Sequence, residues 1–322
     1  MKKLSCRLVF NTPAFLGDAE QNGAWRTPPI KALLRQFWRM DYARRSGWSV
    51  DISRMRAAEG ALFGQAGDKG NSNQSQVRIR LDDWSQGKVK TAPDVGGVVM
   101  GRNRIPAALY AGYGPIAPGP RLKGNAAIQS GEDALLRLAF PSGQGIEQAL
   151  FLADRYGALG GRSRNGWGSF ALAGELEETA IPVREWTDAM QWDWPHAIGQ
   201  DGNGALVWQS APQARWEDAM QLLAQTRADV RRAVPDRLTL AYPDTRGRMP
   251  GWTAKDRVPN SLRFKVRKDG DRFVATVFHV PCRPADALWN ELSADKQRTF
   301  ITCFKAAHAF MDHQQAFKRT EA

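Results

Sequence analysis

Strand-like and helix-like segments follow one another in a fixed order along the first half of this chain, and that order limits the possible folds more than any other feature. Alternating apolar residues indicate strands, and apolar residues three or four apart indicate helices. The sequence predicts a strand over 4–10, a helix over 28–44, strands over 74–81 and 134–140, a helix over 145–159 and a strand over 169–172. Strand, helix, strand, strand, helix, strand is the order of a ferredoxin-like domain. A helix over 51–63 and a Gly- and Pro-rich insertion over 96–131 are additions to it.

The second half of the chain predicts a similar mixture of elements. A linker over 175–204, rich in Trp, Asp and Gly, separates a first domain over 1–174 from a more divergent second domain over 205–322. The second domain is expected to contain a helix over 215–234, a hairpin that turns at Lys268-Asp269-Gly270, and a helix over 285–317 that breaks near Ser293. We therefore expect an α+β protein with two ferredoxin-like (RRM-like) domains that carry insertions.

Composition narrows the choice of partners. The chain has 45 Lys and Arg against 33 Asp and Glu, a net charge of +12, which favours a partner that bears phosphate. No apolar run approaches the roughly 18 residues that cross a bilayer, and no secretory apolar region follows the N-terminus. A cytoplasmic protein without a membrane partner is expected. The three cysteines are far apart and are interpreted as reduced, mostly buried thiols.

The helix over 28–44 is the clearest single element, because Thr27 can cap it and Pro28 and Pro29 suit its first turn. Its basic residues are four apart on one face, with an aromatic beside them: Lys31, Arg35, Arg39 and Trp38. Cations beside an aromatic ring suit a phosphate backbone and an unstacked base. The alternative is a solvated helix face with Trp38 in the core.

A glycine-rich loop over 160–168 follows the helix over 145–159. Four of its nine residues are glycine, so backbone amides could approach a phosphate closely. It lacks the lysine of a nucleotide P-loop, and it follows a helix where both P-loops and dinucleotide loops follow a strand. The loop is therefore better suited to gripping a polynucleotide through Arg162, Arg164, Asn165 and Trp167 than to phosphoryl transfer. The alternative is a structural loop that needs positive φ angles at its glycines.

Three ordered motifs carry a family resemblance. The first combines Thr12-Pro13, Phe15-Leu16-Gly17 and the run 26–39, the second combines Leu62-Phe63-Gly64 with 74–79, and the third is 159–168. This combination resembles the RAMP superfamily of CRISPR-associated proteins, and within it the first subunit of the type III-B Cmr effector complex. The resemblance covers roughly residues 7–172.

The resemblance implies a non-catalytic RNA-binding subunit that contacts guide RNA and target RNA near the guide 3′ end and caps the backbone of an effector complex. Other RAMP subunits would be its protein partners, target cleavage would belong to a different subunit, and no cofactor or metal is implied. The RNA-contacting residues implied by the motifs are Arg26, Lys31, Arg35, Trp38, Arg39, Gln74, Ser75, Arg78, Arg162, Arg164, Asn165 and Trp167. Base pairing would supply sequence recognition, and the protein would hold backbone and shape.

An enzyme is the alternative. Some RAMP proteins cut guide precursors with a histidine and without metal, and His279 would be the first candidate here. His308 and Asp312 could share a helix face, but two ligands do not make a metal site. Asp82 and Asp83 are adjacent on a strand and point to opposite faces, so no paired acids are expected. A nucleotide-dependent transferase is less favoured still, since no phosphate motif has the right setting.

Overall fold

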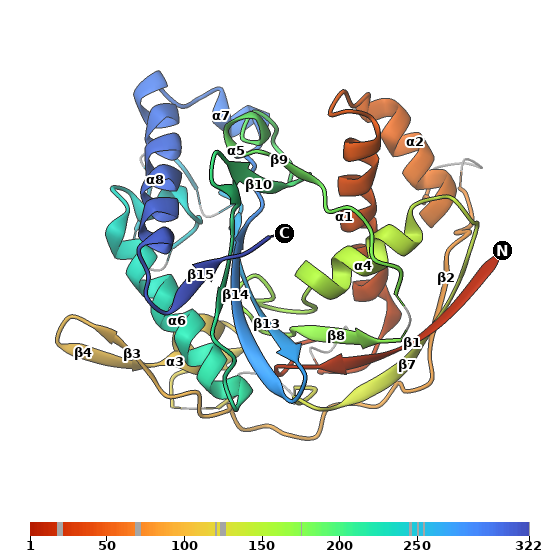
Figure 1. Ribbon diagram of the computed structural model, residues 1–322, viewed down its shortest axis with the longest axis horizontal. Helices are drawn as coiled ribbons and strands as arrows, with labels where there is room; N and C mark the ends of the chain where they lie inside the picture. The colour runs from red at the N-terminus through yellow and green to blue at the C-terminus, as the bar shows by residue number, and fades with distance from the viewer. Residues whose placement is uncertain are drawn as a thin grey trace. The chain divides into compact units, whose positions relative to one another are not determined.

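The chain divides into two units, and each contains one four-stranded sheet (Figure 1). The computed structural model describes residues 1–17, 22–67, 72–119, 121–122, 127–174, 176–244, 247–249, 251–253 and 255–321. Unit 1 comprises Met1–Pro93, Gly112–Pro182 and Lys265–Lys268, and unit 2 comprises Asp94–Ala111, Val183–Phe264 and Asp269–Ala322. Helices and largely antiparallel strands make this the α+β fold that the order of elements predicted.

The sheet of unit 1 has the strand order β2-β7-β1-β8. Its elements are β1 (Lys2–Phe10), α1 (Thr27–Arg45), α2 (Ile52–Phe63), β2 (Arg78–Leu81), β5 (Ile116–Ala117), β6 (Arg121–Leu122), β7 (Asp133–Phe140), α4 (Ile146–Tyr156) and β8 (Phe170–Ala173). Alternate residues of β1 and β7, such as Leu8 and Leu136, are buried, while their neighbours are more exposed. The sheet therefore has one apolar face and one polar face.

Several predicted boundaries of unit 1 need correction. The strand expected over 74–81 begins only at Arg78, because the amides of Gln76 and Val77 bond to the carbonyl of Leu62 instead. Thr27 is the first residue of α1 and not its cap, since Arg26 holds the cap position without a side-chain hydrogen bond. The expected insertion over 96–131 contains short strands and a helix.

Unit 2 repeats the connectivity of unit 1 in its larger sheet, whose order is β13-β14-β12-β15. Its elements are β3 (Gly97–Met100), β4 (Asn103–Pro106), α3 (Ala107–Gly112, whose last residue belongs to unit 1), β9 (Val183–Glu185), α5 (Trp186–Ala189), β10 (Ile198–Asp201), β11 (Gly204–Ala205), β12 (Val207–Ser210), α6 (Trp216–Ala233), a 3₁₀ helix (Arg237–Thr239), β13 (Leu262–Asp269, partly in unit 1), β14 (Arg272–His279), α7 (Asp286–Trp289), α8 (Ala294–Asp312) and β15 (Phe317–Arg319).

Two expectations for the second half differ from the structure. The region expected as a linker over 175–204 contains β9, α5 and β10, whose apolar side chains Trp186 and Ile198 are buried in unit 2. The helix expected over 285–317 is divided as predicted, with Ser293 capping α8, but it ends at Asp312 and the chain then forms β15. All three cysteines are free and buried, and none of the helices within the described residues is long and apolar enough to cross a membrane.

Candidate nucleic-acid interface

The basic residues predicted on α1 are organised by an acid from the neighbouring helix. Glu59 on α2 is buried, with a side chain that is 3% exposed. Its carboxylate accepts hydrogen bonds from Arg35 Nε at 2.5 Å and from Arg39 Nε and Nη2, both at 2.8 Å. The two arginine side chains remain 38% and 42% exposed. One buried carboxylate therefore fixes two half-exposed guanidinium groups side by side, and the three groups together keep a positive charge.

The electrostatics of this cluster follow from its geometry. Burial acts to raise the pKa of Glu59, but hydrogen bonds and charges from Arg39 and Arg35 outweigh it, so the pKa is lower than the ordinary value. Burial, and then the nearby charge of Arg35, lowers the pKa of the Lys31 ammonium. The predicted row of cations on α1 is thus present in the structure, with its last two members bound to Glu59.

Trp38 does not supply the stacking surface that the sequence suggested. Its side chain is buried at 2% exposure, its Nε1 donates to the carbonyl of Gln144 at 2.7 Å, and its ring lies beside Tyr42 and Phe63. A ring enclosed in this way cannot stack on a base in this conformation. The expectation of an aromatic contact here is corrected: Trp38 is a core residue.

The glycine-rich loop is held in place by the segment that precedes α1. The amides of Gly161 and Gly168 donate to the carbonyls of Phe15 and Pro13, both at 2.9 Å. A Cβ at Gly160 would meet the Phe15 carbonyl oxygen at 2.6 Å, and one at Gly168 would meet the Leu159 carbonyl oxygen at 1.8 Å. Both glycines also have positive φ angles. Close backbone approach therefore explains these glycines, as the structural alternative predicted.

The loop presents some of its predicted RNA-contacting side chains and hides others. Arg162 and Arg164 are exposed, whereas Asn165 and Trp167 are buried, Trp167 completely. The Trp167 ring packs on Phe15 with 5.3 Å between centroids. The predicted contacts of Asn165 and Trp167 with a polynucleotide are corrected on this ground, because both anchor the loop from within.

Arg162 has an unusual backbone. Its φ angle is 58°, one of two positive values among the described non-glycine residues. A side chain in the left-handed region costs about 1 kcal/mol or more and persists where surrounding structure imposes it. Among the described residues Arg162 and Arg164 form no ion pair. The loop therefore holds Arg162 in a backbone conformation that an isolated chain disfavours, and it leaves the side chains of Arg162 and Arg164 exposed.

A hydrogen bond from Arg26 links the start of α1 to the same segment. Its Nη1 donates to the carbonyl of Gly17 at 2.5 Å, two residues after the Phe15 carbonyl that binds the loop. The segment over 12–17 thus touches both the loop and the N-terminal end of α1. The first and third sequence motifs are brought together in space by these bonds.

Lys265 fixes the helix that leads into the loop. Its Nζ donates to the carbonyls of Asp154 and Gly157, both at 2.6 Å, at the end of α4. Burial lowers the pKa of this ammonium to about 7, and the charge of Asp154 acts against that shift. A cation bonded to the last carbonyls of a helix also complements the helix dipole. Lys265 was not identified from sequence, since its distance along the chain from α4 hides the contact.

The second motif divides between two surfaces. Gln74 is exposed, and Ser75 Oγ donates to the carbonyl of Val77 at 2.7 Å near the end of α2. Arg78 is exposed on β2, where Val77 and Leu81 point to the buried side and Arg78 to the opposite one. Arg78 therefore lies on the polar face of the sheet, away from the helix row.

Glu59 was also missed from sequence, although a signal existed. Met55, Glu59, Leu62 and Phe63 share one helical face, and all are buried. An acid on an apolar face must find a cationic partner, because burying an unpaired charge is costly. The basic row on the preceding helix was the available partner.

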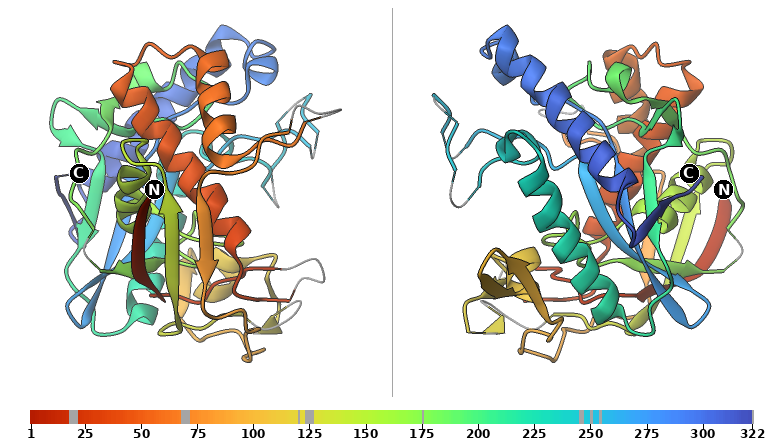
Figure 2. Two further views of the ribbon diagram at one scale, coloured as in Figure 1. Left: turned by 90° about the vertical axis from the view of Figure 1, so that its right-hand side faces the viewer. Right: turned by 60° about the vertical axis from the view of Figure 1, so that its left-hand side comes forward.

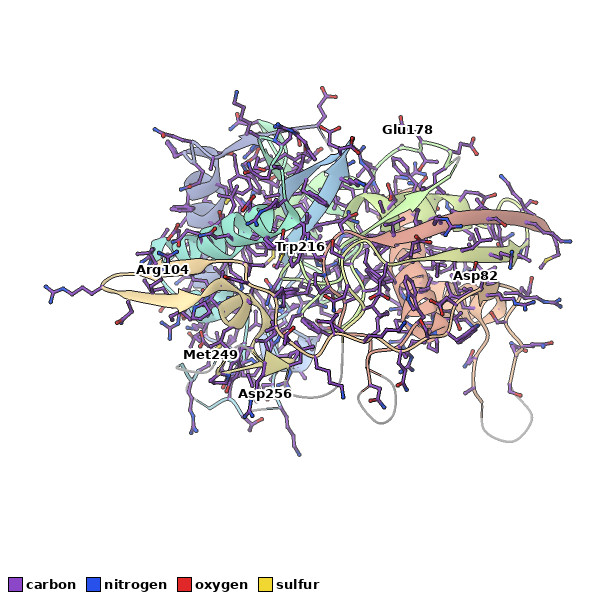
Figure 3. The ribbon with its side chains drawn as sticks, turned by 90° about the horizontal axis from the view of Figure 1, so that it is seen from below. Asp82, Arg104, Glu178, Trp216, Met249 and Asp256 are labelled. Carbon is purple, nitrogen blue, oxygen red and sulfur yellow. The ribbon has the colours of Figure 1, made fainter. Side chains whose placement is uncertain are left out.

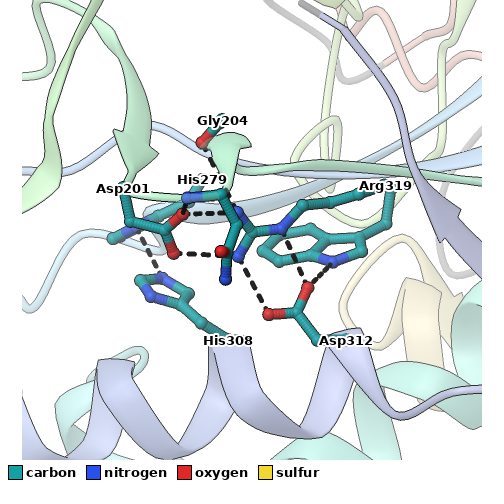
Figure 4. Close-up of polar contacts among 8 residues, drawn as sticks. Asp201, Gly204, His279, His308, Asp312 and Arg319 are labelled. Carbon is teal, nitrogen blue, oxygen red and sulfur yellow. Dashed lines mark hydrogen bonds and ion pairs between the residues drawn. The ribbon is translucent and has the colours of Figure 1, made fainter.

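The histidines and acids weighed for catalysis lie in structural networks of unit 2 or in turns. His279 is fully buried, and its Nδ1 lies 3.0 Å from Nε2 of His308 (Figure 4). Asp312 accepts from Arg319 Nε at 2.9 Å and from Trp208 Nε1 at 2.8 Å. Burial lowers the pKa of His308 to about 4 and that of His279 well below its ordinary value, so both stay neutral.

The adjacent acids of unit 1, Asp82 and Asp83, both accept hydrogen bonds from backbone amides. Asp82 Oδ1 accepts from the amide of Leu135 at 2.7 Å, and Asp83 accepts from the amide and hydroxyl of Ser85. Within the part of the chain that the structure describes, no three His, Cys, Asp or Glu side chains group as metal ligands would.

Comparisons with solved structures find ten similar chains, among them the two that follow. No family model and no curated protein matches the chain. Cmr1 from Pyrococcus furiosus, in its apo form, is similar with a TM-score of 0.48 and 15% identity over 91% of each chain. A type IV-B CRISPR complex is similar with a TM-score of 0.33 and 11% identity, over 57% of this chain and 96% of the other. The sequence motifs resemble the first Cmr subunit, and Cmr1 is one of these two similar structures.

Proposed function

We propose that this chain is a non-catalytic, RNA-binding subunit of a type III-B CRISPR effector complex, which contacts guide or target RNA near the guide 3′ end beside other RAMP subunits. The motif order in the sequence supports the class of protein. The structural observation that supports RNA binding most is the glycine-rich loop. Its backbone is hydrogen-bonded to the segment over 12–17, and it leaves Arg162 and Arg164 exposed. Preorganised guanidinium groups bind phosphate at a low entropic cost.

We propose further that each unit is a ferredoxin-like domain. In unit 1 the order is β1, α1, β2, β7, α4, β8, and in unit 2 it is β12, α6, β13, β14, α8, β15. Both sheets place the four strands in the spatial order second, third, first, fourth. The repeated connectivity supports the two-domain interpretation of the sequence.

The absence of catalysis is part of the proposal and rests on the position of His279. A general acid or base must reach the substrate within hydrogen-bond distance. His279 instead stacks on Phe304 with 4.5 Å between centroids, and its Nε2 lies 3.4 Å from Ser261 Oγ inside unit 2. This burial favours a binding role over the endoribonuclease alternative.

The proposal predicts that Arg162→Gln combined with Arg164→Gln weakens RNA binding. Removing two phosphate contacts should reduce the affinity for a labelled single-stranded RNA roughly tenfold at low salt, and should reduce the slope of log affinity against log salt by about 1.4. Fluorescence anisotropy across a salt series measures both quantities. The melting temperature of the variant should stay close to that of the unaltered chain, since both side chains are exposed.

A matched control removes the same charge elsewhere. Arg298 and Lys305 are exposed on α8 of unit 2, so Arg298→Gln with Lys305→Gln lowers the net charge equally. Equal losses in the two double variants would mean that binding follows net charge alone and would contradict the proposed site. Metal-independent cleavage of the RNA by the unaltered chain would contradict the non-catalytic assignment.

A further inference from the structure

The polar face of the unit 1 sheet gathers basic side chains from three strands. Strand alternation places the odd-numbered residues of β1 and β7 and the even-numbered residues of β2 on this face. Its cations are exposed: Lys3, Arg7, Arg78, Arg80 and Arg137. Figure 2 (left) shows β1, β7 and β2 side by side, as the strand order requires.

Strand register groups these cations closely. Arg80 lies directly opposite Arg137 in the β2–β7 pair, and Arg137 lies opposite Ser5 in the β7–β1 pair. One row further along, Arg78 and Lys3 both lie opposite Ala139, one on each side. Residues directly opposite have Cβ atoms about 4.5–5.5 Å apart, and like charges in that position destabilise a sheet. A sheet that keeps Arg80 against Arg137 carries a cost that an anionic partner would remove.

Within the described residues, one acidic residue forms an ion pair with a cation of this face. Asp133 pairs with Arg7, the one cation of the five with an ion pair among the described residues. Asp82, labelled in Figure 3, lies at the end of β2, where its carboxylate accepts the Leu135 amide at 2.7 Å. Lys3, Arg78, Arg80 and Arg137 form no ion pair within the described part of the chain. Four cations therefore remain available to a ligand.

We propose that this sheet face, defined by Lys3, Arg7, Arg78, Arg80 and Arg137, is a second RNA contact that binds the phosphate backbone of a single strand without reading its bases. The choice of RNA as the partner rests on the proposed function. The other side chains of the face are small or aliphatic, among them Ser5, Val9, Leu135 and Ala139. The face offers no aromatic ring for stacking and no amide side chain for base edges, which base-specific RNA recognition on a sheet requires.

The same composition disfavours a protein partner. Protein interfaces are enriched at their centre in aromatic residues and depleted in lysine. Here the middle row of the face is Arg80, Arg137 and Ser5, and no exposed aromatic lies among its residues. An extended polyanion that follows the rows of cations matches this surface better than a second folded protein.

The test uses a sheet variant that combines Arg80→Gln with Arg137→Gln. This double variant is compared with the loop variant and the α8 control variant described above. The full chain carrying both substitutions should bind a labelled oligouridylate roughly tenfold more weakly than the unaltered chain at low salt. The slope of its log affinity against log salt should be reduced by about 1.4. An oligouridylate with uncharged methylphosphonate linkages should bind the unaltered chain and this variant equally weakly. Relieving the Arg80–Arg137 repulsion should leave the melting temperature unchanged or slightly higher.

Different outcomes separate this inference from the proposed function. Unchanged binding by the sheet variant, together with a loss in the loop variant, would overturn the second contact and leave the proposed function in place. Displacement of the oligouridylate by an oligoglutamate of equal charge, dependent on Arg80 and Arg137, would assign the face to an acidic protein surface and overturn the inference. Failure of the unaltered chain to bind oligouridylate would overturn both proposals.

Discussion

The two units have the same strand and helix order but use charge in opposite ways. In unit 1 the central strand β7 alternates between buried and less buried residues, and one face of the sheet is open to solvent. In unit 2, β14 is buried at six consecutive positions. The cations described on α1, on the glycine-rich loop and on the sheet face of unit 1 lie on surfaces, although Lys265 of the same unit is buried. Unit 2 encloses polar groups in networks such as that of His279, His308 and Arg319.

This contrast teaches that a shared connectivity does not determine where a partner can bind. A half-buried sheet leaves alternate positions free to carry charge at little structural cost. A sheet buried on both faces must satisfy every polar group internally. The binding surfaces of the chain are accordingly expected in unit 1, and unit 2 should show the larger stability effects when its charges are altered.

Mild acid should produce the largest difference between the units. All four histidines lie in unit 2, and burial lowers the pKa of His196 and of His308 to about 4 and that of His279 well below its ordinary value. An unfolded histidine has a pKa of about 6.5, so below that pH the unfolded state binds protons that the folded state does not. Stability should fall as the pH decreases from about 6.5 towards 4, by about 1.4 kcal/mol per pH unit for each of these three buried histidines.

Native-state hydrogen exchange measures this difference strand by strand. Amides of β14 should lose protection between about pH 7 and about pH 5, relative to the intrinsic exchange rate, while amides of β7 in unit 1 should lose little. His308→Phe should reduce the slope by the contribution of one histidine. Equal losses in both strands would contradict the assignment of the effect to buried histidines.

Replacing Arg319 should give the next largest effect. Its guanidinium binds Asp201 and Asp312 and lies over the Trp208 ring at 5.5 Å, with only 16% of the side chain exposed. Arg319→Met should lower the free energy of unfolding by about 3 kcal/mol, because two carboxylates lose their partner. Urea denaturation measures the change. Arg298→Met is the matched control, since its pair with Asp295 is exposed and should contribute at most about 0.5 kcal/mol.

Local patterns in the sequence predicted the elements of both units well. The proline-started helix α1, the alternating strands β1 and β7, and the hairpin of β13 and β14 depend on residues close together in the chain. The strand expected over 74–81 failed in its first half, because Gln76 and Val77 bond to Leu62, a long-range choice that alternation does not reveal. The Trp-rich stretch read as a linker became part of unit 2 for a related reason: Trp186 packs against His308, far along the chain.

The candidate site could likewise be predicted where it depends on local sequence, but not where it depends on long-range packing. The positions of Arg35, Arg39, Arg162 and Arg164 on their elements follow from sequence spacing, and the structure leaves these side chains at least partly exposed. The aromatic partners do not follow, because a tryptophan beside a basic residue can point to either side of a helix or loop. Trp38 and Trp167 point inward. The pairing of Arg80 with Arg137 depends on strand register, which no single strand contains.

Glu59→Gln should separate the structural role of the α1 cations from their proposed role with RNA. Glutamine keeps the size but removes the charge that binds Arg35 and Arg39, so the free energy of unfolding should fall by about 2 kcal/mol. RNA affinity should stay the same or rise, because the folded cluster gains positive charge. Denaturation and anisotropy measure the two quantities. Glu178→Gln, at the exposed position labelled in Figure 3, is the control, and it should change neither the free energy of unfolding nor the RNA affinity.

Arg80→Thr should give the smallest effect and a stabilising one. It removes the like charge opposite Arg137 and introduces a residue that favours strands, so unit 1 should gain about 0.5 kcal/mol. Arg78→Thr is its matched control on the same strand, since Arg78 lies opposite Ala139 and has no repulsion to relieve. Thermal unfolding of the two variants isolates the opposing charge. If Arg80→Thr is more stable than Arg78→Thr and both variants bind RNA more weakly, then arginine at position 80 favours RNA binding and lowers the stability of unit 1.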